Sequence, residues 1–259
     1  MQTRPAGDVD YEVAGVGYSK IRQADPRIEA QVHAALGDAR TVLNIGAGAG
    51  SYEPKDRHVI AIEPAAAMRA QRGPGRVPAI TGVAEALPLD DQSVDASMAT
   101  VTVHQWLDLA KGLAELCRVT RGPIVILTAD PDAVGGSWFS AYQAERVAVE
   151  RRRMPAIQSL IAGLAGGEGR VDVEQVPVPF DCTDGLAEAF YGRPERMLDP
   201  AARAAQSSWR FVGPDVEAQS VARLSADLKS GAWDDKYGAL RSQSTFVGGL
   251  RLVVRRSTA

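Results

Sequence analysis

The stretch LNIGAGAGSYEP, from Leu43 to Pro54, decides the fold. It begins as the end of an apolar, β-branched run and becomes a loop with glycines at 46, 48 and 50, here called the glycine loop (46–50). Loops of this kind bring the backbone close to a nucleotide. Only seven residues, SYEPKDR, separate Gly50 from the next apolar run at His58. Because a crossover helix needs a longer connection, we expect none here, and therefore no helix N-terminus to hold a phosphate.

Apolar runs alternate with helical patterns on both sides of the glycine loop. Asp25-Pro26 marks a helix start, and Ile28, Val32 and Leu36 give that helix one apolar face. Alternation of strands and helices is typical of an α/β fold with a parallel sheet. We expect strands at 41–45, 58–64, 77–80, 93–101 and 123–130, helices at 65–72 and 106–119, then a helical stretch at 137–165, a strand at 171–178, a polar and helical insertion at 181–244, and a last strand at 248–256.

Composition is that of an ordinary globular protein. The chain has 259 residues, 45% of them hydrophobic and 24% charged, which suits one large domain. We divide it into a cofactor-binding half with an N-terminal helical cap (1–130) and a substrate-side half (131–259). The formal charge of −3 gives no electrostatic footprint for nucleic acid, and the basic run at 151–153 is interpreted as a solvated helix face.

The two cysteines and the N-terminal residues bear on where in the cell the protein is expected to be. Cys117 and Cys182 belong to no CxxC pair, so we expect neither a disulfide framework nor a zinc site. The chain has no apolar stretch of the ~20 residues that cross a bilayer, and its first residues, MQTRPAGDVDYE, lack an apolar signal region. We therefore predict a cytoplasmic protein with no membrane partner.

The glycine loop follows GxGxG rather than the dinucleotide pattern GxGxxG. Ser51 stands where the third glycine would let a following helix pack closely. The phosphate-binding pattern GxxxxGK[ST] is absent too. Glu63 ends the second strand, where a carboxylate can accept hydrogen bonds from ribose hydroxyls, as in NAD and S-adenosylmethionine sites alike. A nucleoside without phosphates is the better fit.

Five segments in order carry a family resemblance. VLNIGAGAG, VIAIEPAAAM, GVAEALPLDDQSVDA, TVTVHQWLD and ELCRVTRGPIVILT resemble the class I S-adenosylmethionine-dependent methyltransferases, in the branch often labelled type 11, over about 41–130. The flanking YSKIRQADPR and DCTDGLAEAFYGRPE resemble a group of actinobacterial small-molecule methyltransferases. The resemblance implies a Rossmann-like, mostly parallel sheet with an antiparallel last strand, a helical lid insertion, and S-adenosyl-L-methionine as cofactor.

The resemblance also implies cofactor-binding positions. Glu63 would bind the ribose, Met68 would lie against the adenine or else in the core, and Arg22 would pair with the carboxylate or else lie on the surface. Two positions depart from the family: Val83 stands where Asp is frequent, and Asn44 where an acidic residue is frequent. The full expected set is Tyr18, Arg22, Asn44, Gly46, Ala47, Gly48, Glu63, Pro64, Met68, Ala84, Glu85 and Thr100.

Methyl transfer from a sulfonium requires alignment of the two reactants and no metal. His104, in VHQW after the fourth expected strand, is the candidate general base or a residue that orients the substrate; the alternatives are a pocket-wall residue and a hydrogen-bond anchor for the loop. Expected substrate-binding residues are Tyr11, Trp106, Trp138, Tyr142 and Tyr191. The alternative is pocket wall or core for Trp106, and packing in the lid core for Trp138, Tyr142 and Tyr191. We predict a small-molecule acceptor and a monomer or homodimer. The alternatives are a nicotinamide-dependent reductase and a catalytically silent S-adenosylmethionine-binding partner protein.

Overall fold

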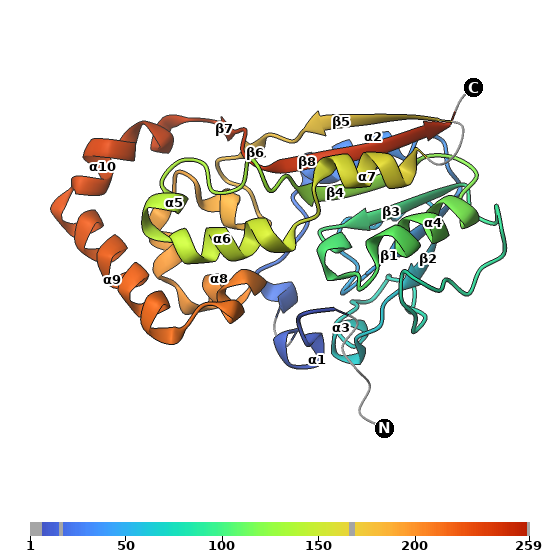
Figure 1. The fold of residues 1–259 in the computed structure, drawn as a ribbon, viewed down its shortest axis with the longest axis horizontal. Helices are drawn as coiled ribbons and strands as arrows, with labels where there is room; N and C mark the ends of the chain where they lie inside the picture. Colours follow the sequence, from blue (N-terminus) through green and yellow to red (C-terminus); the bar gives the residue numbers. More distant parts are fainter. Residues whose placement is uncertain (1–6, 16–17, 166–168, 258–259) are drawn as a thin grey trace.

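A six-stranded sheet organises the computed structural model, which describes residues 7–15, 18–165 and 169–257 (Figure 1). The strand order is β2-β1-β3-β4-β8-β5. The first four strands pair in parallel, and β8 is antiparallel to both of its neighbours. The bounds are β1 Thr41–Ile45, β2 His58–Ile62, β3 Ala96–Thr100, β4 Ile124–Ala129, β5 Gly169–Gln175 and β8 Leu250–Ser257. The expected mostly parallel sheet with an antiparallel last strand is confirmed.

Alternating side chains of the strands fill two cores, one on each face of the sheet. Leu43, Ile126 and Val253 pack with α4 (Leu109–Val119) and α7 (Ile157–Leu164) on one face. On the other face, residues such as Val42, Val125 and Val254 pack with α2 (Pro26–Ala35) and with the insertion. Successive residues of a strand point to opposite faces of the sheet. Because both faces are covered, side chains on both are apolar, and the strand sequences are continuous apolar runs.

Short polar residues set the starts of several helices. Asp25 accepts the amide of Arg27 at the start of α2, and Asp108 accepts that of Lys111 at the start of α4, both at 3.0 Å. The other α-helices are α1 Tyr11–Ala14, α3 Ala66–Arg69, α5 Phe139–Tyr142, α6 Ala144–Arg153, α8 Pro200–Ala204, α9 Pro214–Ser230 and α10 Ala232–Tyr237. The 3₁₀ turns are η1 Tyr18–Lys20, η2 Val103–Gln105, η3 Ala187–Phe190, η4 Pro194–Leu198, η5 Ser207–Phe211 and η6 Gly238–Ser242.

Apart from α7, which packs on the sheet, the helices after β4 gather beyond the end of the sheet toward which β3 and β4 point (Figure 1). Here α5, α6, α8, α9 and α10 form a lid, together with a small two-stranded sheet of β6 Val178–Pro179 and β7 Thr245–Phe246. Trp138 and Trp233 are fully buried within it, with ring centroids 6.0 Å apart. The lid thus covers the carboxyl edge of the parallel strands, where ligands of α/β folds bind.

The connection between β1 and β2 contains no helix from Gly46 to Arg57. The expectation drawn from its length is therefore confirmed. A four-residue helix, α3, follows β2 instead. The β1–β2 connection therefore has no helix whose N-terminus could point at a ligand bound by the glycine loop.

Some expected elements are shorter than their patterns suggested. The strand expected at 77–80 is wrong: only Ile80 forms an isolated bridge, with Ile62, because Pro78 has no amide hydrogen to continue a ladder. The helix expected from Trp106 begins at Leu109, after the Asp108 cap. Within the residues that the structure describes, no helix has both the length and the apolar character that a bilayer crossing demands.

Candidate functional site

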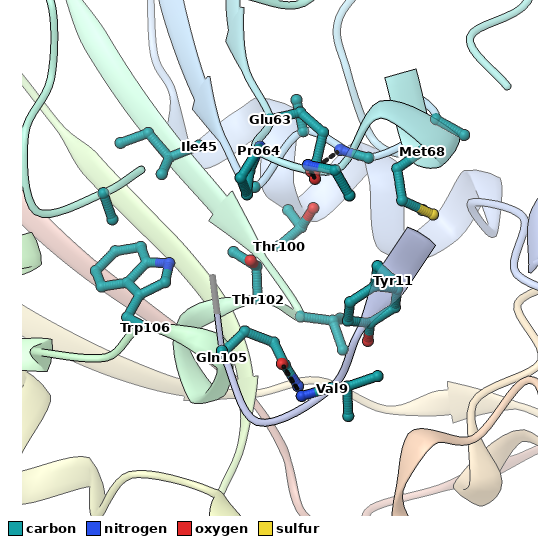
Figure 2. Close-up of a pocket in the computed structure, with 18 of the residues that line it drawn as sticks. Val9, Tyr11, Ile45, Glu63, Pro64, Met68, Thr100, Thr102, Gln105 and Trp106 are labelled. Atoms are coloured by element: carbon teal, nitrogen blue, oxygen red, sulfur yellow. Dashed lines mark hydrogen bonds between the residues drawn. The ribbon is translucent and has the colours of Figure 1, made fainter. Parts of the chain in front are cut away.

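A cavity of about 1290 Å³, part of it open to solvent, lies at the carboxyl ends of β1 and β3 (Figure 2). The glycine loop, the residues after β2 and the N-terminal segment enclose it. Figure 2 shows Glu63, Thr100 and Trp106 around it, with Tyr11 on the N-terminal side. We call it the first cavity. Its walls come from segments far apart in the sequence, so the fold, not one motif, creates it.

The glycine loop forms the floor of this cavity and has no room for side chains. Gly46 and Gly48 have φ of +63° and +50°, in the left-handed region that glycine adopts without strain. A Cβ on Gly46 would lie 2.0 Å from Oγ1 of Thr102, and one on Gly48 would lie 3.2 Å from Cε of Met68. Backbone is therefore exposed to any ligand in the cavity.

Glu63 lies beside the loop, with its carboxylate held in place. Its Oε2 accepts the amide of Gly48 at 2.8 Å, and its Oε1 accepts that of Ala65 at 2.9 Å. Burial raises the pKa of Glu63, and the two backbone amides oppose that rise. Each oxygen keeps a further acceptor position, so the carboxylate can bind two hydroxyl donors.

A buried cluster behind the cavity holds the helix-free loop. Nη2 of Arg72 donates to both carboxylate oxygens of Glu53, at 2.9 and 2.8 Å, and these side chains are 4% and 1% exposed. Arg72 also donates to the carbonyl of Gly48 at 3.2 Å. Asn44 donates to Glu53 at 2.9 Å. The three side chains, Asn44, Glu53 and Arg72, form what we call the loop cluster, and none of them lines the first cavity.

Arg22 enters the wall of the cavity through an ion pair. Its Nε donates to Oδ1 of Asp184 at 2.5 Å, and the hydroxyl of Tyr52 donates to Oδ2 of Asp184 at 2.8 Å. Burial and the charge of Asp184 raise the pKa of Tyr52. Tyr52 itself has a φ of +62°, a strained geometry for a bulky residue. The ion pair joins the N-terminal segment to the lid across the cavity.

The N-terminal segment (7–15 and 18–22) covers the cavity, and contacts of its first residues help to anchor it. The amide of Val9 donates to Oε1 of Gln105 at 3.4 Å (Figure 2). The carboxylate of Glu12 accepts the amides at the start of α3, at 2.6 and 2.9 Å. Asp8 pairs with Arg153 of α6 at 2.6 Å. This last pair corrects the interpretation of 151–153 as a wholly solvated face: the Arg153 side chain is 9% exposed.

His104 lines a second, smaller cavity between η2, the end of α6 and η5. Tyr11, Arg22 and Val101 line both cavities. Removal from water and the nearby Arg153 lower the pKa of His104 to about 3, against the opposing charge of Asp8. The imidazole is therefore neutral at pH 7.

Most of the expected cofactor positions meet in the first cavity. It is lined by Arg22, Gly46, Ala47, Gly48, Glu63, Pro64, Met68, Ala84, Glu85 and Thr100, and also by Tyr11 and Trp106 from the expected substrate set. Asn44 lies in the loop cluster instead. The side chain of Tyr18 lies outside the described residues.

The structure places three expected substrate residues in the lid core, along neither of these two cavities. Trp138 donates its ring N–H to the carbonyl of Tyr191 at 2.8 Å. The hydroxyls of Tyr142 and Tyr191 donate to Asp227 and to the carbonyl of Gln243, both at 2.7 Å. Each polar tip is satisfied inside the lid, as buried aromatics require.

Several residues of the site carried no recognisable sequence signal. In the sequence, Glu53 belongs to the spacer SYEPKDR and Arg72 to the end of an expected helix, and neither position marks a buried pair. Asp184 and Gln105 reach the cavity from the lid and from η2. Position 44 gives an indirect indication. Because Asn44 stands where the family frequently has an acidic residue, a carboxylate for the cofactor's ammonium group has to come from another part of the chain.

Known proteins with sequences similar to part of this chain are described as methyltransferases. Residues 43–123 match the family described as "Methyltransferase domain". Uncharacterized methyltransferases of Mycobacterium bovis and Mycobacterium tuberculosis are 36% identical over 89 residues, which is 32% of this chain and 36% of theirs. The chain thus matches about a third of the length of these curated relatives.

Solved structures extend the similarity to nearly the whole chain. A structure from Anabaena variabilis, described as "Putative methyltransferase from antibiotic biosynthesis pathway", is 30% identical with a TM-score of 0.85, over 92% of this chain and 99% of that one. Geranyl diphosphate C-methyltransferase from Streptomyces coelicolor, solved with S-adenosyl-L-homocysteine, shares the fold at 14% identity and a TM-score of 0.52, over 89% and 78%.

Proposed function

The chain belongs to the class I S-adenosylmethionine-dependent methyltransferases, and from this premise we propose that it methylates a small organic acceptor held beneath the lid. One observation carries the proposal: a helix-free glycine loop and a buried, oriented carboxylate share one cavity, which the N-terminal segment covers and which Asp184 borders from the lid side. A concave cavity of this kind suits a small molecule better than a macromolecule.

The residues that line the first cavity fit the nucleoside part of S-adenosylmethionine. Glu63 binds the two ribose hydroxyls with the acceptor positions that the backbone amides leave unused. Met68 would lie against the adenine, and Ala84 and Glu85 would lie at its edge, as all three line the first cavity. Gly46 and Gly48 present bare backbone to the cavity, since a Cβ at either position would be crowded by Thr102 or Met68. When bound, the cofactor supplies a methyl group on a positively charged sulfur.

The methionine part is expected near the Arg22–Asp184 ion pair. Asp184 is 2% exposed and lines the first cavity. Its carboxylate suits an ammonium group, while Arg22 suits a carboxylate. This arrangement compensates for Asn44, whose amide is engaged with Glu53. Ammonium recognition thus comes from the lid side rather than from the end of β1.

His104 acts on the acceptor as a neutral imidazole. With a pKa lowered to about 3, it is neutral at pH 7, with one ring N–H that donates and one bare ring nitrogen that accepts, yet it is a weak base because proton affinity falls with pKa. Its main role is therefore to orient the acceptor. Trp106 and Thr100 line the first cavity.

The nicotinamide reductase loses support because nothing in the Gly46–Arg57 connection forms the helix that would hold a pyrophosphate. Turnover with methyl-labelled S-adenosylmethionine tests the proposal. We expect label to pass to at least one member of a panel of small alcohols, phenols, amines and thiols, and not to a protein or nucleic-acid substrate. Binding of the cofactor without transfer to any member would favour the silent partner protein instead.

A further inference from the structure

The second cavity lies next to the first and shares three of its wall residues, Tyr11, Arg22 and Val101. Its empty space is about 460 Å³, part of it open to solvent. Met154, Leu186 and Ala187 give it an apolar side. A molecule in this cavity would therefore meet the contents of the first one at a single junction.

Backbone strain marks that junction. Val101 has a φ of +53°, which is a genuine outlier for a β-branched residue. Its amide still donates to the carbonyl of Leu127 at 2.7 Å, so the strand pairing holds the strained residue in place. Such strain persists where the surrounding structure enforces it and gathers at functional sites.

The charged groups around the second cavity are already paired with one another. Arg153 donates to both oxygens of Asp8, at 2.6 and 2.9 Å. Glu150 pairs with Arg146 on the same helix, and Arg22, which also lines the first cavity, is assigned there to the methionine part of the cofactor. A charged ligand would have to break one of these pairs, so the cavity favours an uncharged one.

Two polar atoms of the cavity's residues have no hydrogen-bond partner in the part of the chain that the structure describes. They are Nδ1 of His104 and Oε1 of Gln206, and both are buried. A buried polar atom left unpaired costs free energy. A hydroxyl can donate to Oε1 of Gln206, and it can donate to or accept from His104, whichever ring nitrogen carries the proton.

We propose that the second cavity is the acceptor subsite, and that it takes an uncharged acceptor with a hydroxyl on an apolar body, held by His104 and Gln206. The inference rests on the proposed function only in naming the occupant an acceptor. The apolar side holds the body of the molecule, and the two unpaired atoms select the hydroxyl.

Phenol is a suitable probe, with anisole as the matched compound without a donor, and benzoate and benzylammonium as charged counterparts. Ligand-detected NMR would measure their binding to the protein saturated with S-adenosylhomocysteine. We expect phenol to bind more tightly than the other three. His104→Phe and Gln206→Met should each weaken phenol by roughly fivefold, the loss of about one neutral hydrogen bond. Gln31→Met on α2, which lines neither cavity, is the control.

The outcomes separate the two proposals. Calorimetry should give unchanged affinity for S-adenosylhomocysteine in both variants, which also shows that they fold. Failure of the wild-type protein to bind S-adenosylhomocysteine would count against the proposed function, whatever phenol does. With S-adenosylhomocysteine bound, undetectable phenol binding, anisole or a charged probe binding as tightly as phenol, or variants that bind phenol like the wild type would each overturn the subsite.

Discussion

Replacing Arg72 by Met tests whether the loop cluster takes over the structural role of the missing helix. The change removes the cation that faces Glu53, whose side chain is 1% exposed. The Glu53 carboxylate then stays buried, with Asn44 and the more distant Arg76, whose Nη1 lies 3.9 Å from Oε2 of Glu53, as its neighbours. Breaking a buried pair from one side costs about 3–5 kcal/mol. We expect a loss of that size in the free energy of unfolding, measured by urea denaturation with tryptophan fluorescence.

A second variant separates pairing from packing. Arg72→Met combined with Glu53→Gln leaves no unpaired charge, so the double variant should be more stable than Arg72→Met alone. Arg121→Met is the matched control, because the Arg121–Asp95 pair is largely exposed, at 51% and 31%, and is worth at most about 1 kcal/mol. Equal losses for Arg72→Met and Arg121→Met, or additive losses in the double variant, would refute the reasoning.

The remaining predictions concern the ligand sites and the lid. Glu63→Ala should weaken S-adenosylhomocysteine by about 1–3 kcal/mol, because the ribose hydroxyls lose a charged acceptor; unchanged affinity in calorimetry would exclude the ribose role. His104→Ala should lower turnover far more than cofactor affinity. The plot of the wild-type rate against pH should show no inflection near pH 6.5 that disappears in this variant, because the pKa of His104 is lowered to about 3. Burial raises the pKa of Glu188 from 4.5 to about 7, so its stabilising effect is complete below pH 4.5 and is lost as pH rises through 7. Glu188→Gln, which keeps an oxygen for the amide of Gly249, should flatten unfolding free energy against pH in that range; a curve parallel to the wild type would contradict the shift.

The sheet was predictable because its signals are local. The glycine loop, the short spacer to His58 and the apolar runs each lie within a few residues of sequence. The strand expected at 77–80 failed because one residue, Pro78, outweighed the apolar pattern around it.

The site was predictable only where a motif carries it. Glu63 and the glycines follow strands, so their place at the sheet edge is fixed by topology. Arg72 and Glu53 meet only after folding, and nothing in their spacing announces a buried pair. For the lid aromatics, the sequence is compatible with either a pocket wall or the lid core. Their positions are defined by hydrogen bonds such as that from Trp138 to the carbonyl of Tyr191, and such hydrogen bonds depend on tertiary packing.

Calorimetric titration of the wild-type protein with S-adenosylhomocysteine and, separately, with NAD⁺ tests the central claim most directly, because the two ligands differ in the pyrophosphate that the helix-free loop has no means to hold. The account predicts a one-to-one isotherm for S-adenosylhomocysteine and no binding heat for NAD⁺. Saturable binding of NAD⁺ with none of S-adenosylhomocysteine would contradict it.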